Sequence, residues 1–84
     1  MPRFYFDVRE GPIFIKDEEG CEFLSLDEAE QEAIQAVVSM GKDRLTRGDT
    51  REVTVEVRDE DQKRVLTVGV HLIIDRAHPS DSDS

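Results

Sequence analysis

The feature that most constrains the fold is a pair of alternating apolar runs in the second half of the chain, Val53–Val57 and Leu66–Ile74. Successive side chains of a strand point to opposite faces, so each run predicts a strand with one apolar face. With Asp61-Gln62 as a two-residue loop, Glu60 faces Lys63 and every apolar residue of both runs falls on one side. A slip by one residue would turn one set to water, so the pattern predicts a hairpin in this register.

The N-terminal segment predicts a second hairpin. Apolar residues alternate with polar or amphipathic ones from Phe4 to Val8, and Ile13-Phe14-Ile15 follows after a break at Gly11-Pro12. We expect Glu10-Gly11 to be the loop, with Val8 facing Ile13 and Phe6 facing Ile15. Proline has no amide donor, so the second strand is expected at a sheet edge.

A single helix is predicted between the hairpins. Ser25 and Glu28 have the spacing of a capping box, in which Glu28 would accept from the amide of Ser25. An alanine-rich apolar stripe with spacings of three and four follows, and the helix is expected to end at residues 47–49. The stripe comprises Leu26, Ala29, Ala33, Ala36, Val37 and Met40.

The element order predicts an α+β fold, a two-layer ββαββ sandwich with one helix on one face of a four-stranded antiparallel sheet. We expect a single domain over residues 1–75 and a disordered polar tail over residues 76–84. The predicted core comprises Phe4, Phe6, Val8, Ile13, Ile15, Leu26, Ala29, Ala33, Val37, Met40, Val53, Val55, Val57, Leu66, Val68, Val70 and Leu72.

Charge narrows the classes of partner. The formal net charge of −9 over 84 residues opposes binding to nucleic acid or to an anionic membrane surface. No apolar run reaches the length of a signal peptide or a membrane span, so a cytoplasmic protein is expected. Residues 17–32 carry eight carboxylates and no base: Asp17, Glu18, Glu19, Glu22, Asp27, Glu28, Glu30 and Glu32.

Four blocks of sequence carry a resemblance to a known family. They are PRFYFD at residues 2–7, DEEG at 17–20, LDEA at 26–29 with Ala33 after it, and VRDED at 57–61. In this order and spacing the chain resembles a family of short uncharacterised proteins of rhizobia and related alphaproteobacteria. Gln62 stands where the family usually has glycine, which bears on the turn and not on the fold. The resemblance implies a small bacterial protein of unknown function and carries over no catalytic residue.

Three features of the sequence could carry chemistry. The acidic stretch could bind a divalent cation, but it lacks the alternating ligands of an EF-hand, and a solvated turn with a helix start explains it. Cys21 lies among Glu18, Glu19 and Glu22, which disfavour a thiolate, and one thiol makes no internal disulfide. His71 has no second histidine at ligand spacing, so it is interpreted as a surface residue of the sheet. We therefore expect no catalytic, cofactor-binding or metal-binding residues, and no enzyme.

The sheet face away from the helix is the candidate interaction surface, because apolar and aromatic side chains lie there among charges. Its candidate residues are Tyr5, Phe14, Val65, His71 and Ile73. The first hypothesis is a protein-interaction module, a homo-oligomer formed through this open face or through an edge strand. The second is an acidic, antitoxin-like protein whose residues 17–32 bind a basic partner. The third is an RNA-binding domain that stacks bases on Tyr5 and Phe14, which the net charge opposes.

Overall fold

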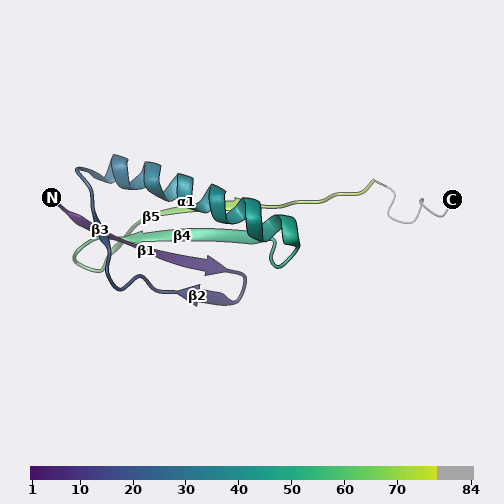
Figure 1. Ribbon diagram of the computed structural model, residues 1–84, viewed down its shortest axis with the longest axis horizontal. Coiled ribbons are helices and arrows are strands. Elements are labelled where there is room, and N and C mark those ends of the chain that lie inside the picture. Colours follow the sequence, from purple (N-terminus) through teal and green to yellow (C-terminus); the bar gives the residue numbers. More distant parts are fainter. Residues whose placement is uncertain (78–84) are drawn as a thin grey trace.

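The two valine-rich runs form the predicted C-terminal hairpin in the computed structural model, which describes residues 1–77 (Figure 1). Strand β4 (Glu52–Arg58) pairs with β5 (Arg64–His71), and Val57 lies opposite Leu66 as predicted. The predicted pairing of Glu60 with Lys63 is wrong, because the register shifts after Val57 and the amide of Asp59 donates to the carbonyl of Lys63. The loop has three residues, 60–62, and ends in a left-handed conformation at Gln62, with φ of 68°.

The N-terminal hairpin comprises β1 (Arg3–Glu10) and β2 (Ile13–Ile15). The register is Val8 opposite Ile15 and Glu10 opposite Ile13, so the predicted Val8–Ile13 and Phe6–Ile15 pairs are wrong by two residues. The turn is Gly11-Pro12, and Gly11 has φ of 56°, a value that favours glycine at the first position of such a turn. A shift of two residues leaves each side chain on its predicted face.

The sheet confirms the α+β prediction, with five strands where four were expected. The order is β2-β1-β4-β5, and the short β3 (Cys21–Glu22) pairs with β1. Strand β1 is antiparallel to β4, with Phe6 opposite Val57 and Val8 opposite Val55. A two-residue strand has no alternation to detect, so β3 could not be predicted from the pattern.

Helix α1 (Leu26–Arg47) begins and ends where the sequence predicts. The Ser25 hydroxyl accepts from the amide of Glu28 at 3.3 Å. The Glu28 carboxylate accepts from the amide of Leu24 at 2.9 Å, and not from Ser25 as predicted. Gly48 closes the helix with φ of 81°.

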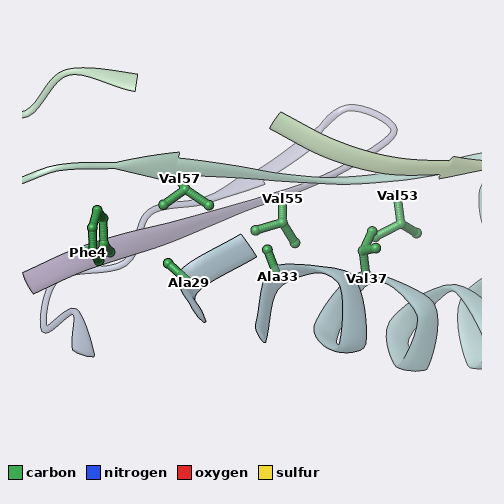
Figure 2. Packing of buried hydrophobic residues seen from close by; sticks show 7 residues of the cluster. All are labelled: Phe4, Ala29, Ala33, Val37, Val53, Val55 and Val57. Atoms are coloured by element: carbon green, nitrogen blue, oxygen red, sulfur yellow. The ribbon is translucent and has the colours of Figure 1, made fainter. Parts of the chain in front are cut away.

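The core lies between α1 and the sheet, mainly over β4, with Phe4 of β1 at one end (Figure 2). Fully buried hydrophobic residues are Phe4, Ala29, Ala33, Val37, Val53, Val55 and Val57. Ile13, Ile15 and Leu26 were predicted in the core but are exposed at 55%, 54% and 40%. The reason for the two isoleucines is that α1 packs on β4 and β5 and leaves the helix-side surface of β2 uncovered.

Two residues that were not in the predicted core, Phe23 and Gly41, contribute to the packing between α1 and the sheet. Phe23 packs against the rings of Phe4 and Phe6, with centroid distances of 6.4 and 5.6 Å. Gly41 is buried in α1, and a Cβ there would lie 2.7 Å from Cγ2 of Val70. The absence of a side chain at Gly41 therefore lets the helix approach β5 closely.

Beyond β5, residues 72–77 continue as an extended segment that leaves the body of the molecule (Figure 1). The amide of Leu72 donates to the carbonyl of Arg51 at 2.9 Å, which prolongs the β4–β5 ladder by one residue. Most of the predicted tail, residues 78–84, lies outside the described residues. Over residues 1–77, no helix combines the length and apolarity needed to cross a membrane.

Candidate functional site

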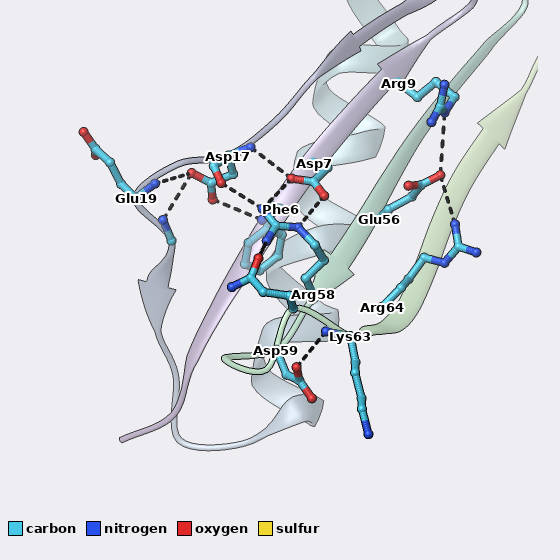
Figure 3. A network of polar contacts seen from close by, with 12 residues as sticks. Phe6, Asp7, Arg9, Asp17, Glu19, Glu56, Arg58, Asp59, Lys63 and Arg64 are labelled. Carbon is cyan, nitrogen blue, oxygen red and sulfur yellow. Dashed lines mark hydrogen bonds and ion pairs between the residues drawn. The ribbon is translucent and has the colours of Figure 1, made fainter.

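The outer face of the sheet, opposite α1, contains a buried carboxylate that its sequence position did not reveal. Asp7 is 4% exposed, and its two oxygens accept from Arg58 at 2.7 and 3.0 Å. The backbone amide of Asp17 donates to Asp7 at 2.9 Å, and Arg58 donates to the carbonyl of Asp17 at 2.9 Å (Figure 3). We call these three residues the Asp7–Arg58–Asp17 clamp, because they tie β1, β4 and the loop after β2 together.

The side chain of Asp17 completes the clamp by ordering its own loop. Its carboxylate accepts from the amide of Phe6 at 3.0 Å and from the amides of Glu19 and Gly20, both at 3.1 Å. The acidic segment that begins at residue 17 was predicted as a solvated turn, and its first carboxylate instead accepts three backbone hydrogen bonds. Spacing alone gave no signal for this contact.

The clamp keeps its carboxylates ionised. Burial raises the pKa of Asp7, but the hydrogen bond and charge of Arg58, with the amide of Asp17, outweigh burial and lower it. Burial likewise opposes ionisation of Asp17, and the amides of Phe6, Gly20 and Glu19 bring its pKa below the ordinary value. The hydrogen bond from Arg58 to Asp7 raises the pKa of Arg58. The lowered carboxyl pKa values and the raised guanidinium pKa favour the charged form of all three groups.

Two of the predicted surface residues, Tyr5 and Phe14, lie on this outer face beneath arginines. The guanidinium of Arg58 lies 4.9 Å from the ring centre of Tyr5, and that of Arg9 lies 4.6 Å from the ring centre of Phe14. Glu56 lies between two arginines on the same face, with its Oε2 at 3.6 Å from Nε of Arg9 and 3.5 Å from Nη1 of Arg64 (Figure 3). Charged partners therefore occupy much of the open sheet face.

The other three predicted residues lie at the far side of the sheet: Val65 and His71 on the outer face of β5, and Ile73 in the segment after it. Val65 is 39% exposed, Ile73 is 76% exposed, and the exposed His71 lies opposite Glu52. Strand β5 ends the strand order, so within residues 1–77 its outer edge pairs with no other strand. The structure thus divides the predicted surface into an arginine-covered part and an open edge.

A groove between α1 and the open edge of β5 was not predicted. It has a volume of about 440 Å³ and is lined by Val38, Gly41, Lys42, Leu45, Thr46 and Val70. Val38 is 53% exposed, while Ile34 and Leu45 are half-buried. The signal was present in the sequence, because Ile34, Val38, Gly41 and Leu45 recur at spacings of four, three and four. We call these four residues the second helix stripe.

A larger hollow of about 560 Å³ lies between β2 and the end of α1, and Ile13 and Ile15 form part of its lining. Its two arginines pair with acids: Arg44 with Glu10, and Arg47 with Asp43 and Asp49.

Cys21 is exposed on β3. Among residues 1–77, no three histidine, cysteine or carboxylate side chains are grouped so as to hold a metal ion.

Comparison with known proteins places the chain in a protein family but identifies no activity. No curated protein and no solved structure matches the chain. One family model matches residues 3–71, which run from the first residue of β1 to the last residue of β5. The match covers the whole sheet and α1 and excludes the segment after His71. The chain therefore belongs to the family described as Domain of unknown function (DUF6894).

Proposed function

We propose that this chain is a non-enzymatic protein-interaction module that self-associates through the open edge of β5. The observation that carries the proposal is an edge strand of eight residues, Arg64–His71, next to an apolar groove. An unpaired strand edge offers a row of backbone donors and acceptors to a second strand. The neighbouring side chains Val65, Val38 and Ile73 are exposed apolar groups that a partner would remove from water.

Of the two self-association routes predicted from the sequence, the edge has more support than the open face. The rings of Tyr5 and Phe14 each have an arginine over them, and Glu56 holds Arg9 and Arg64 between the strands. A partner docking on that face would have to displace or desolvate these ion pairs, which is costly. At the β5 edge a partner would add hydrogen bonds and bury apolar surface.

The same observations bear on the other two hypotheses. Stacking of RNA bases on Tyr5 and Phe14 would compete with Arg58 and Arg9 for the ring faces. In the acidic stretch, Asp17 and Glu28 accept backbone hydrogen bonds and Glu22 pairs with Arg3. Fewer carboxylates are thus free for a basic partner than the count of eight implies. The cytoplasmic location and the bacterial origin expected from the sequence stay predictions.

Sedimentation equilibrium of the full chain from micromolar to millimolar concentration tests the proposal. We expect a concentration-dependent dimer, and we expect Ile73→Asp to weaken it at least tenfold by placing a charge beside the edge. Phe14→Asp is the matched control: it places the same charge on the open face and should leave the dimer unchanged. A monomer at every concentration would overturn the proposal. A dimer lost in Phe14→Asp but kept in Ile73→Asp would overturn the choice of the edge.

A further inference from the structure

We infer that the groove beside β5 is filled by a second copy of this chain in one specific register, with the two β5 strands antiparallel about Gly69. This inference rests on the proposed self-association and adds which residues meet across it. It assigns the segment after His71, which the family model does not include, to the same interface.

The strand edge that could pair with a second copy is longer than β5 itself. The hydrogen bond from Leu72 to Arg51 shows that the ladder continues past His71, and the chain then leaves β5 as an extended segment (Figure 1). The edge open to a partner thus runs from Arg64 to at least Leu72. Two such edges that pair antiparallel along most of their length have their two-fold axis near the middle, at Val68, Gly69 or Val70, and the side chains that each axis brings together distinguish these registers.

A register centred on Gly69 brings complementary side chains together. With the axis at Gly69, Val65 faces Ile73 of the second copy on the outer face, and Leu66 faces its Leu72 on the helix face. Both pairs are apolar, and Val65 and Ile73 are exposed in the single chain. Just beyond them, Lys63 faces Asp75 of the second copy, which pairs opposite charges.

When the two-fold axis is moved by one residue to either side of Gly69, the apolar pair on the outer face and the pair of opposite charges are lost. With the axis at Val68, Val65 would face His71 of the second copy and Lys63 would face its Ile73. With the axis at Val70, Val65 would face Asp75 and Arg64 would face Arg76, a pair of like charges. Like charges directly opposite each other destabilise a strand pair. Apolar and charge complementarity therefore both select Gly69.

Pairing of the two β5 edges also brings the two copies of α1 together. Because α1 packs on both β4 and β5, its axis lies near the line between these strands. Strands are about 4.8 Å apart, so joining two β5 edges would place the two copies of α1 about 10 Å apart. Packed helices are typically separated by about 8–10 Å, so the two helices would touch. The second helix stripe, with its exposed Val38, lies on the side that would face the other helix.

Disulfide trapping tests the register, in the full chain with Cys21→Ser to remove the native thiol. We expect the double variant Val65→Cys with Ile73→Cys to form a covalent dimer on mild oxidation, because directly opposite residues lie at about 4.5–5.5 Å between Cα atoms. Val65→Cys alone is the first control, since its two copies would be eight residues apart, roughly 27 Å. Val65→Cys with His71→Cys is the second, since it reports the axis at Val68. Both controls should cross-link at least tenfold more slowly.

The helix contact has its own test. Val38→Lys should weaken the dimer at least tenfold, whereas Gln35→Lys, an exposed helix position outside the second helix stripe, should not. Both sites are exposed, so circular dichroism should show both variants folded. Three results would overturn the register while the protein still sediments as a dimer: fastest cross-linking in Val65→Cys with His71→Cys, no cross-linking in either double variant, or equal cross-linking in Val65→Cys alone. In each of these cases the proposed self-association would still stand. A chain that stays monomeric overturns both.

Discussion

The hairpin of β1 and β2 and the hairpin of β4 and β5 both carry alternating apolar residues, yet only the second lies under α1. Val53, Val55 and Val57 are fully buried, whereas Ile13 and Ile15 are more than half exposed. The N-terminal hairpin is fastened through its pairing with β4 and through the Asp7–Arg58–Asp17 clamp. Strand β4 and, through Phe4, β1 therefore share the apolar core, whereas β2 and the loop after it are held largely by backbone and charged hydrogen bonds.

The largest effect should come from breaking the clamp. Replacing Arg58 by methionine would leave Asp7 buried without its cation, since the two side chains are 12% and 5% exposed. We expect a loss of about 3–5 kcal/mol in the free energy of unfolding, measured by urea titration. Arg64→Met is the matched control, because Arg64 is 61% exposed and pairs at the surface; its cost should stay below about 1 kcal/mol. Equal effects of the two variants would show that the clamp does not fasten the hairpin.

The second prediction compares the two hairpins at residues on their helix-facing side. Val55→Thr keeps the shape of a fully buried side chain and adds a hydroxyl, so we expect a loss of about 1–3 kcal/mol in unfolding free energy. Ile15→Thr makes a similar change of polarity at a side chain that is 54% exposed, and should change stability by no more than about 0.5 kcal/mol. Denaturant titration of both variants checks the difference. A larger loss at Ile15 would contradict the view that β2 lies outside the apolar core.

The sequence predicts the pairing and burial of the β4–β5 hairpin better than those of the β1–β2 hairpin. The register of Val53, Val55 and Val57 follows from periodicity, because burial on one face leaves one consistent alignment. The burial of Ile13 and Ile15 was wrongly predicted, since periodicity assigns a face but not which strands the helix covers. The clamp joins Asp7 to residues 10 and 51 positions away, a contact that only the folded chain creates.

The candidate surface shows the same limit. Val65, His71 and Ile73 were correctly expected outside the core, but the separation of Tyr5 and Phe14 from them depends on where Arg58 and Arg9 lie. The spacing of four, three and four residues from Ile34 to Leu45 does indicate the second helix stripe. It was missed because the alanine-rich stripe already explained why a helix forms.

The third prediction probes the close approach of α1 to β5. Alanine favours a helix over glycine by about 1 kcal/mol, but a Cβ at Gly41 would lie 2.7 Å from Val70. Overpacking of this kind costs about 1–3 kcal/mol, so we expect Gly41→Ala to lower stability by about 1 kcal/mol overall. Ser39→Ala on the exposed side of the helix is the control and should stay within about 0.5 kcal/mol. A stabilised Gly41→Ala protein in thermal unfolding would show that the contact with Val70 is not tight.

The smallest effect should be a dependence on acid that is confined to one side of the molecule. The pKa values of Asp7 and Asp17 are lowered from the ordinary 3.8 in the folded chain. A carboxyl with a depressed folded pKa contributes stability that is complete above its unfolded pKa and is lost as pH falls through the folded value. Hydrogen exchange should therefore show the amides of β1 and the loop after β2 losing protection as pH drops below about 4. Amides of α1, and those of β4 that donate to β5, should keep theirs until the whole chain unfolds.

The comparison of two variants separates the clamp from the general effect of acid on a chain with twenty carboxylates. Asp17→Asn removes one of the depressed groups, so β1 should exchange faster at neutral pH and its protection should change less on acidification. Glu32→Gln removes a charge from an exposed site of α1 and should leave the pH profile of β1 unchanged. If both variants shift that profile equally, net charge rather than the clamp governs the acid response. If only Asp17→Asn does, then the Asp17 carboxylate, which begins the acidic stretch, fastens the loop after β2 to β1, and this attachment depends on its ionisation.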